Sequence, residues 1–127
     1  MTKPAVRPTD GELEILSVLW RRGPSTVREV HEELQARRVG YTTVLKLLQI
    51  MAEKGLVARD ESERAHVYRA RLPQDQAEKR LVGDLLDRAF GGSASRLVLR
   101  ALSSKKASPE EIERIRALLD ELEGGNR

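Results

Sequence analysis

The chain has 127 residues, of which 39% are apolar, and its formal net charge is +3. This length suits one ordinary domain, or a small domain with an appendage, and it excludes large catalytic architectures. The sequence contains no cysteine, which excludes disulfides, thiolate metal sites and thiol catalysis. We therefore expect a cytoplasmic protein. The sequence has no run of roughly 20 apolar residues, so we expect no insertion into a membrane.

The first helix is expected to begin at Thr9. Thr9 and Glu12 have the spacing of a capping box, in which each side chain bonds the other residue's backbone N–H. The segment Arg22-Gly23-Pro24 should end this helix. The apolar residues between these two signals recur at helical spacing and are Leu13, Ile15, Leu16, Leu19 and Trp20.

A second capping box, formed by Thr26 and Glu29, predicts a short second helix. Val27, Val30 and Leu34 should point inward, and we expect the helix to finish near Arg38.

The third helix is the most informative stretch, GYTTVLKLLQIMAEKGLV, from Gly40 to Val57. Its apolar side, which should face a core, consists of Val44, Leu47, Leu48 and Met51. Its polar side consists of Thr42, Thr43, Lys46 and Gln49. These side chains are donors and acceptors suited to base edges and phosphates. Gly55 fits a left-handed C-terminal cap, so an extended segment should follow.

Two short strands are expected next, over residues 56–59 and 65–69, joined by a polar turn. Three helices followed by a β-hairpin describe a winged helix-turn-helix domain, here assigned to residues 1–72. Arg59 and Arg64 are candidate phosphate contacts on the wing. The carboxylates of Asp60, Glu61 and Glu63 beside them would repel a phosphate.

Residues 73–127 are expected to form three further helices without a strand, so the fold class is mostly α with a small β-hairpin wing. About fifty residues in three helices make a marginal independent core, and pairing with a second copy would cover their apolar faces. The residues predicted to form this dimer interface are Leu97, Val98, Leu102, Ile112, Ile115, Leu118, Leu119 and Leu122.

From Thr9 to Leu122 the chain resembles the BlaI/MecI penicillinase repressor family of bacterial winged-helix regulators. The similar segments are Glu12 to Trp20, TTVLKLLQIMAEKGLV, HVYRA, GGSASRLVLRAL and SPEEIERIRALL. The resemblance implies a homodimer that binds a palindromic double-stranded DNA operator, with the C-terminal helices as the dimer interface. It also implies that Thr42, Thr43 and Lys46 contact the operator.

Two differences from the family pattern concern how repression is relieved. Family members that sense copper use cysteines, and this chain has none. Members controlled by a membrane-bound sensor protease are cut at an Asn-Phe bond, whereas the matching place here is Leu99-Arg100-Ala101-Leu102. Arg100 and Ala101 are therefore the candidate cleavage position.

The other polar residues of the sequence suggest alternatives to DNA binding. His31 and His66 lack the spacing of a metal site or a catalytic pair, so we expect no metal, no cofactor and no enzymatic activity. Tyr41 could contact DNA or pack against the second helix. The competing function is a winged-helix module that binds a protein instead of an operator, because fold does not fix function. DNA binding would weaken steeply with salt.

Overall fold

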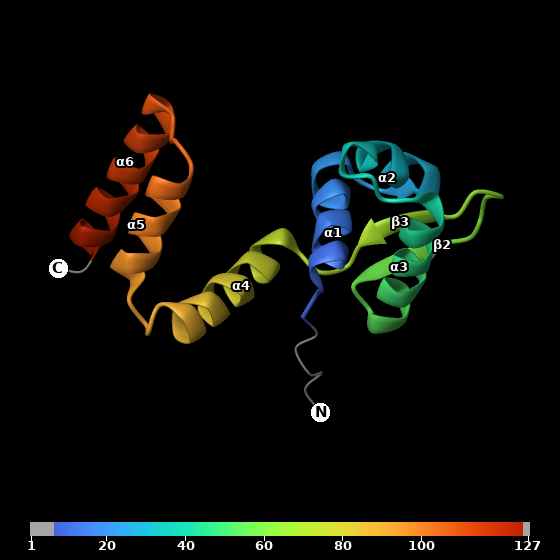
Figure 1. The fold of residues 1–127 in the computed structure, drawn as a ribbon, viewed down its shortest axis with the longest axis horizontal. Coiled ribbons are helices and arrows are strands. Elements are labelled where there is room, and N and C mark those ends of the chain that lie inside the picture. The colour runs from blue at the N-terminus through green and yellow to red at the C-terminus, as the bar shows by residue number, and fades with distance from the viewer. Residues whose placement is uncertain (1–6, 126–127) are drawn as a thin grey trace. The chain divides into compact units, whose positions relative to one another are not determined.

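The computed structural model describes residues 7–125 and divides the chain into two compact units, residues 1–79 and 80–127. The elements of the N-terminal unit are, in order, α1 (Asp10–Arg22), β1 (Ser25–Thr26), α2 (Val27–Glu33), the 3₁₀ turn η1 (Gln35–Arg37), α3 (Tyr41–Lys54), β2 (Val57–Asp60) and β3 (Val67–Ala70). Helix α4 (Gln74–Ala89) begins in this unit, and α5 (Ala94–Ser104) and α6 (Pro109–Gly125) follow it (Figure 1). The predicted fold class is confirmed.

Both predicted capping boxes are present in the N-terminal unit. The backbone N–H of Thr9 donates to Glu12 Oε1 at 2.9 Å, and the Glu12 N–H donates to Thr9 Oγ1 at 3.3 Å. The equivalent distances between Thr26 and Glu29 are 2.9 and 3.2 Å. Helix α1 ends at Arg22 and is followed by the cap residue Gly23, which has a positive φ of 95°. These four-residue signals depend on local geometry alone, which is why the sequence predicted them correctly.

Helix α2 is shorter than expected, because it ends at Glu33 instead of continuing to Arg38. The N–H of the buried Leu34 is shared between the carbonyls of Val30 and His31, both at 3.1 Å. This sharing tightens the chain into the 3₁₀ turn η1. Arg38 then adopts a left-handed conformation with φ 58°, which reverses the chain toward α3.

The sheet has three antiparallel strands in the order β1-β3-β2. The predicted hairpin is present as β2 and β3, whereas the sequence did not predict β1. In β1, Ser25 lies opposite Tyr68 of β3, and Thr26 lies opposite Val67 of β3. A strand of two residues has no periodicity to read, so only its pairing partner identifies it. The hairpin strands begin one and two residues later than predicted, at Val57 and Val67.

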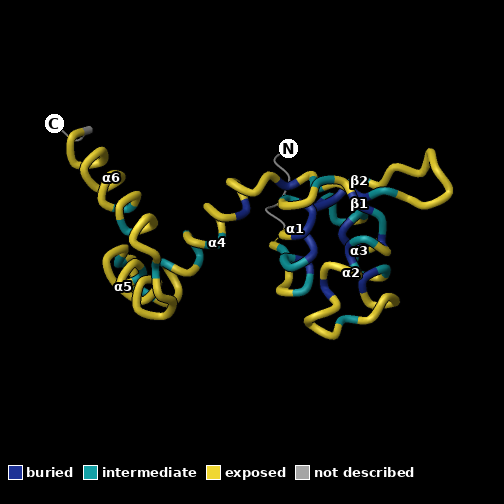
Figure 2. The backbone as a smooth tube through the Cα atoms, turned by 90° about the horizontal axis from the view of Figure 1, so that it is seen from above, coloured by how far each residue is buried: buried dark blue, intermediate teal, exposed yellow. Residues whose placement is uncertain are grey.

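The hydrophobic core lies between α1, α2, α3 and the sheet, and it extends to the first turn of α4 through Ala77. Figure 2 shows this concentration of buried segments (dark blue) in the N-terminal unit. The largest fully buried apolar side chains are Tyr68, Ile15, Leu16, Leu48 and Met51. Trp20 closes one side of the core by donating its indole N–H to the Leu72 carbonyl at 2.9 Å. The segment that follows β3 is thereby tied to α1.

The C-terminal unit has helix caps but no buried residue among its described positions. Ser93 Oγ accepts the Arg96 N–H at 3.2 Å, and Ser108 Oγ accepts the Glu111 N–H at 3.1 Å. In Figure 2, α5 and α6 are mostly exposed (yellow). Their helices are thus formed by local signals without a core to cover their apolar faces.

Candidate nucleic-acid interface

Helix α3 presents a polar, exposed face opposite a buried apolar one. Val44, Leu48 and Met51 are fully buried, whereas Thr42 and Lys46 are exposed. The helix begins after Gly40 and ends at Gly55, whose φ of 83° is the expected left-handed cap. The exposed predicted contacts on this helix are Thr42, Thr43, Lys46 and Gln49.

An ion pair that the sequence did not predict fixes the end of α3 against the start of α1. Lys54 Nζ donates to both carboxylate oxygens of Glu12, at 3.0 and 2.8 Å, and Glu12 is only 1% exposed. Burial favours a higher pKa for Glu12, but the hydrogen bonds from Lys54 and from the Thr9 backbone outweigh it and hold the pKa below its usual value. The orientation of α3 is therefore set at both its apolar face and its C-terminal end.

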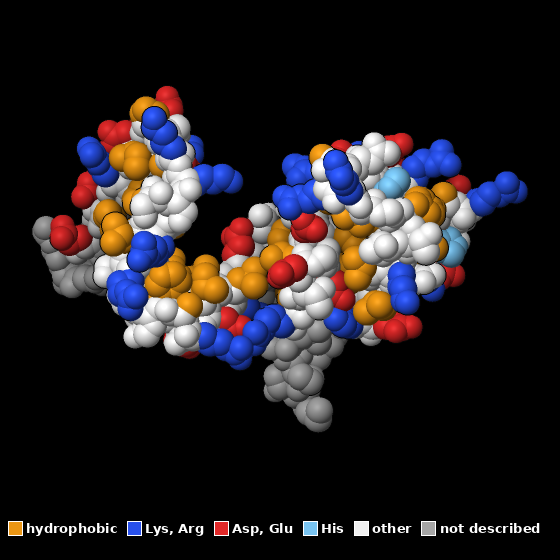
Figure 3. Space-filling view, in the orientation of Figure 1, with side chains coloured by type: hydrophobic (Ala, Val, Ile, Leu, Met, Phe, Trp, Pro, Cys, Tyr) orange, Lys and Arg blue, Asp and Glu red, His pale blue; other side chains and the backbone are white. Residues whose placement is uncertain are grey.

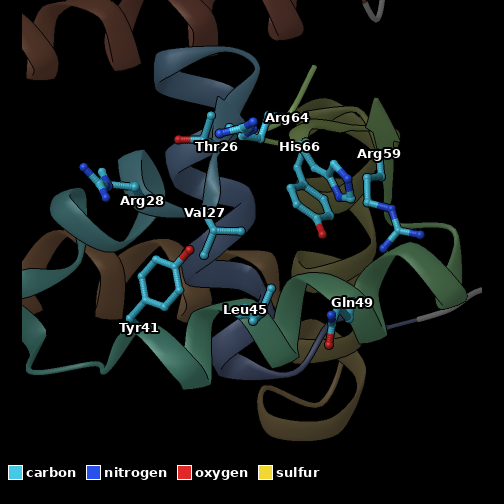
Figure 4. Close-up of a pocket in the computed structure, with 11 residues that line it drawn as sticks. Thr26, Val27, Arg28, Tyr41, Leu45, Gln49, Arg59, Arg64 and His66 are labelled. Atoms are coloured by element: carbon cyan, nitrogen blue, oxygen red, sulfur yellow. The ribbon is translucent and has the colours of Figure 1, made fainter. Parts of the chain in front are cut away.

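Beside α3 lies a cleft of about 610 Å³, bounded by α2, α3 and the hairpin (Figure 4). It is lined by Thr26, Val27, Arg28, Tyr41, Leu45, Gln49, Arg59, Arg64, Ala65, His66 and Tyr68. Three arginines and one histidine are among these residues, and none of them is acidic. The cleft therefore brings together three of the predicted contacts: Gln49, Arg59 and Arg64. Thr42, Thr43 and Lys46 lie on α3 outside it.

The three arginines of the cleft differ in their partners. Arg59 Nε pairs with Glu61 Oε2 at 2.6 Å. A hydrogen bond with Tyr68 and, second, the charge of Glu61 raise the pKa of Arg59 above its usual value. Arg28 and Arg64 form no ion pair with any residue from 7 to 125. The positive charge available to a ligand thus comes mainly from Arg28 and Arg64.

The structure places Tyr41 against the second helix, which was one of its two predicted positions. Its ring meets that of His31 edge to face, with centroids 5.8 Å apart and an interplanar angle of 81°. The side chain is still 46% exposed and lines the cleft. His31 thus supports a tyrosine whose hydroxyl points toward α2 in Figure 4.

Arg28 and His66 are cleft residues that the sequence did not assign to an interface. Arg28 is exposed at the start of α2. Its proximity to the hairpin follows from the pairing of β1 with β3, because β1 leads directly into α2. No local spacing could have indicated this pairing.

The residues predicted for dimerisation and cleavage all lie on α5 and α6. Val98, Leu102, Leu118, Leu119 and Leu122 are exposed, and Leu97, Ile112 and Ile115 are half-buried. Figure 3 shows hydrophobic side chains (orange) open to solvent on one face of this unit. Arg100 and Ala101 are also exposed, in the middle of α5.

Within residues 7–125 there is no group of three His, Cys, Asp or Glu side chains that could hold a metal ion. None of the described helices is long and apolar enough to span a bilayer.

Comparisons with known proteins indicate the same family. The penicillinase repressor family model matches residues 8–121. The chain is 38% identical to the transcriptional regulator BlaI of Mycobacterium tuberculosis over 120 residues, covering 91% of this chain and 86% of the relative. It is 22% identical to the penicillinase repressor of Staphylococcus aureus, with 96% and 98% of the two chains covered.

A solved structure, the DNA-binding domain of the repressor BlaI, matches with a TM-score of 0.50 and 26% identity, covering 60% of this chain and 93% of that one. The winged-helix fold is therefore confirmed. The expectation that the chain is not an enzyme is also confirmed, because the family consists of transcriptional repressors. By the extent of these matches, the chain belongs to the penicillinase repressor family.

Proposed function

We propose that this protein represses transcription by binding a palindromic DNA operator as a homodimer. The observation that carries the proposal is the exposed polar face of α3, held on a buried apolar face and flanked by a cleft without carboxylates. An α-helix fits the major groove of B-DNA, where donors and acceptors identify each base pair. Bacterial DNA lies in the cytoplasm, so this is the proposed place of action.

In this proposal α3 enters the major groove with Thr42, Thr43 and Lys46 toward base edges and phosphates. Gln49 lies one turn further along, at the cleft. Arg64 has no carboxylate partner among the described residues and would meet the DNA backbone. Arg59 is the weaker phosphate contact, because Glu61 already neutralises it.

The dimer is proposed to form through the apolar residues of α5 and α6, so residues 73–127 act as a dimerisation region that follows a DNA-binding domain of residues 1–72. The support is the exposure of these side chains in the single chain, with Leu119 60% and Leu122 57% exposed. Burial of apolar area contributes about 25 cal/mol per Å², which favours covering them with a second copy.

Release of the operator is proposed to follow cleavage within α5 at Arg100-Ala101, by a membrane-bound sensor protease. Both residues are exposed, and Ser104 Oγ donates to the Arg100 carbonyl at 2.6 Å. A serine that bonds back to the preceding turn slightly weakens a helix, which favours the local opening that a protease requires. Cleavage there would separate the α6 stripe from the DNA-binding domain.

The Lys46→Ala variant tests the proposed function. An operator would first be selected from random duplexes with the wild-type protein, and affinities would then be measured by fluorescence anisotropy. Loss of one specific contact should cost about 1 to 3 kcal/mol per half-site. Lys79→Ala, on the exposed start of α4, is the charge-matched control. Unchanged operator affinity in a folded Lys46→Ala protein would remove Lys46 from the interface.

The competing protein-interaction function predicts a different outcome. A wild-type protein that selects no palindrome, and that binds another protein with little dependence on salt, would favour that module over a repressor.

A further inference from the structure

We infer that the cleft between α2, α3 and the hairpin is a binding site for one phosphate of the DNA backbone, with Arg28 and Tyr41 as contact residues alongside Arg64. This inference rests on the proposed function and adds the α2 side of the interface to it. It follows from the composition, the charge and the position of the cleft.

The composition of the cleft is the first observation. The chain has 20 Asp and Glu residues, yet none of them lines the cleft. Its polar lining consists instead of hydrogen-bond donors, including guanidinium, imidazole, amide and hydroxyl groups. A cleft with several donors, no carboxylate and guanidinium groups at its edges suits an anion, and guanidinium matches the geometry of phosphate oxygens.

The second observation is that two of the three arginines in the cleft form no ion pair with the described residues. Arg28 and Arg64 have no carboxylate partner among residues 7–125, whereas Arg59 is neutralised by Glu61. Figure 4 shows Arg28 and Arg59 on opposite sides of the cleft, with the α3 side chains between them. A ligand in the cleft would therefore meet cationic side chains from two elements that are far apart in the sequence.

Tyr41 adds a neutral donor to the lining of the cleft. Its ring is held edge to face by His31, so the hydroxyl has a restricted set of positions. A preorganised hydroxyl donates to a phosphate oxygen at a lower entropic cost than a mobile one. In this arrangement His31 is a positioning residue, because it acts only through Tyr41.

The position of the cleft indicates which ligand it would bind. A helix in the major groove has a sugar-phosphate backbone along each side of it. The cleft runs beside α3, adjacent to the face that carries the proposed base contacts, so it would face one of these backbones. A backbone phosphate is therefore the occupant, and a free phosphate is the alternative that experiment must exclude.

The main test is the salt dependence of DNA binding by Arg28→Ala, Arg28→Lys and the control Lys79→Ala. Each phosphate contact contributes about 0.9 to the slope of log affinity against log salt, so a dimer that loses two contacts should lose about 2 from the slope. Affinity at low salt should fall about tenfold per site. Arg28→Lys should restore most of the slope, because it keeps the charge. An unchanged slope in Arg28→Ala would overturn the inference.

The same measurement on a duplex without the operator separates this inference from the proposed function. A phosphate contact carries no sequence information, so Arg28→Ala should lower the slope on any DNA. If the wild type selects no operator, the proposed function fails while the cleft remains testable on nonspecific DNA. If the operator is bound but the Arg28→Ala slope is normal, only the cleft inference fails.

Neutral methylphosphonate substitutions, placed one at a time along the operator, locate the contacted phosphate. At one position per half-site, the substitution should weaken DNA binding by the wild type but leave DNA binding by Arg28→Ala unchanged. This is expected because the two changes remove the two partners of one contact. Additive losses at every position would contradict the inference.

Titration of the DNA-free protein with inorganic phosphate, followed through the NMR signals of Tyr41 and His66, tests whether a free phosphate occupies the cleft instead of a DNA phosphate. Saturation by phosphate, but not by chloride at equal ionic strength, together with a normal Arg28→Ala slope would assign the cleft to a free anion and overturn the inference.

Discussion

The two units of this protein contain similar helical signals but differ in what those helices bury. In the N-terminal unit, Ile15, Leu16 and Leu48 are fully buried around a small sheet. In the C-terminal unit, leucines at the same helical spacing remain open, and Leu99 is 65% exposed. Amphipathic spacing thus predicts that a face will be covered without specifying the covering element. The difference is the basis of the proposed dimer, in which a second chain would cover the apolar face of the C-terminal unit.

The largest expected effect is loss of stability from a cavity in the N-terminal core. Leu48→Ala removes a side chain of zero exposure and should cost about 2 to 5 kcal/mol in the free energy of unfolding. Leu119→Ala removes the same atoms from an exposed position, so the N-terminal unit should unfold at an unchanged urea concentration. Urea titration monitored by the fluorescence of Trp20 compares the two. Equal losses would mean that the units do not differ as described.

The next effect concerns dimerisation. Leu118→Asp places a charge on the apolar stripe of α6 and should give monomers with operator affinity lower by roughly a hundredfold, because two linked half-sites no longer act together. Ala117→Asp, which adds the same residue to the opposite side of the helix, is the matched control and should remain dimeric.

Sedimentation equilibrium measures the assembly and anisotropy measures the affinity. A wild-type protein that sediments as a monomer at micromolar concentration would contradict the proposed dimer.

The smallest effect concerns the ion pair between Glu12 and Lys54, which is confined to the N-terminal unit. Because the folded pKa of Glu12 lies below its unfolded value, the pair stabilises the fold above the unfolded pKa, and this stability is lost as pH falls through the folded pKa. Glu12→Gln should cost about 1 to 3 kcal/mol at pH 7.

Denaturation at a series of pH values from neutral to acid checks this prediction. The difference between Glu12→Gln and the wild type should shrink below the usual carboxylate pKa of about 4.3. A difference independent of pH would show that Glu12 stabilises α1 only through its capping geometry.

Much of the secondary structure was predictable because its signals are local. The boxes at Thr9 and Thr26, the left-handed Gly55, and the caps at Ser93 and Ser108 each involve residues within four positions of one another. The polar and apolar faces of α3 were also correct, since helical spacing alone assigns them. The predicted contacts on α3 are therefore in place as exposed residues, and their role in DNA binding stays a prediction.

Only the tertiary structure determined how distant segments combine. Glu12 and Lys54 are 42 positions apart, and no spacing rule predicts that they pair in the interior. The pairing of β1 with β3 brings α2 beside the hairpin, so that Arg28 and Arg64 line one cleft from which every carboxylate is absent. A sequence encodes these contacts through the packing of the whole core, whereas its readable patterns extend over only a few residues.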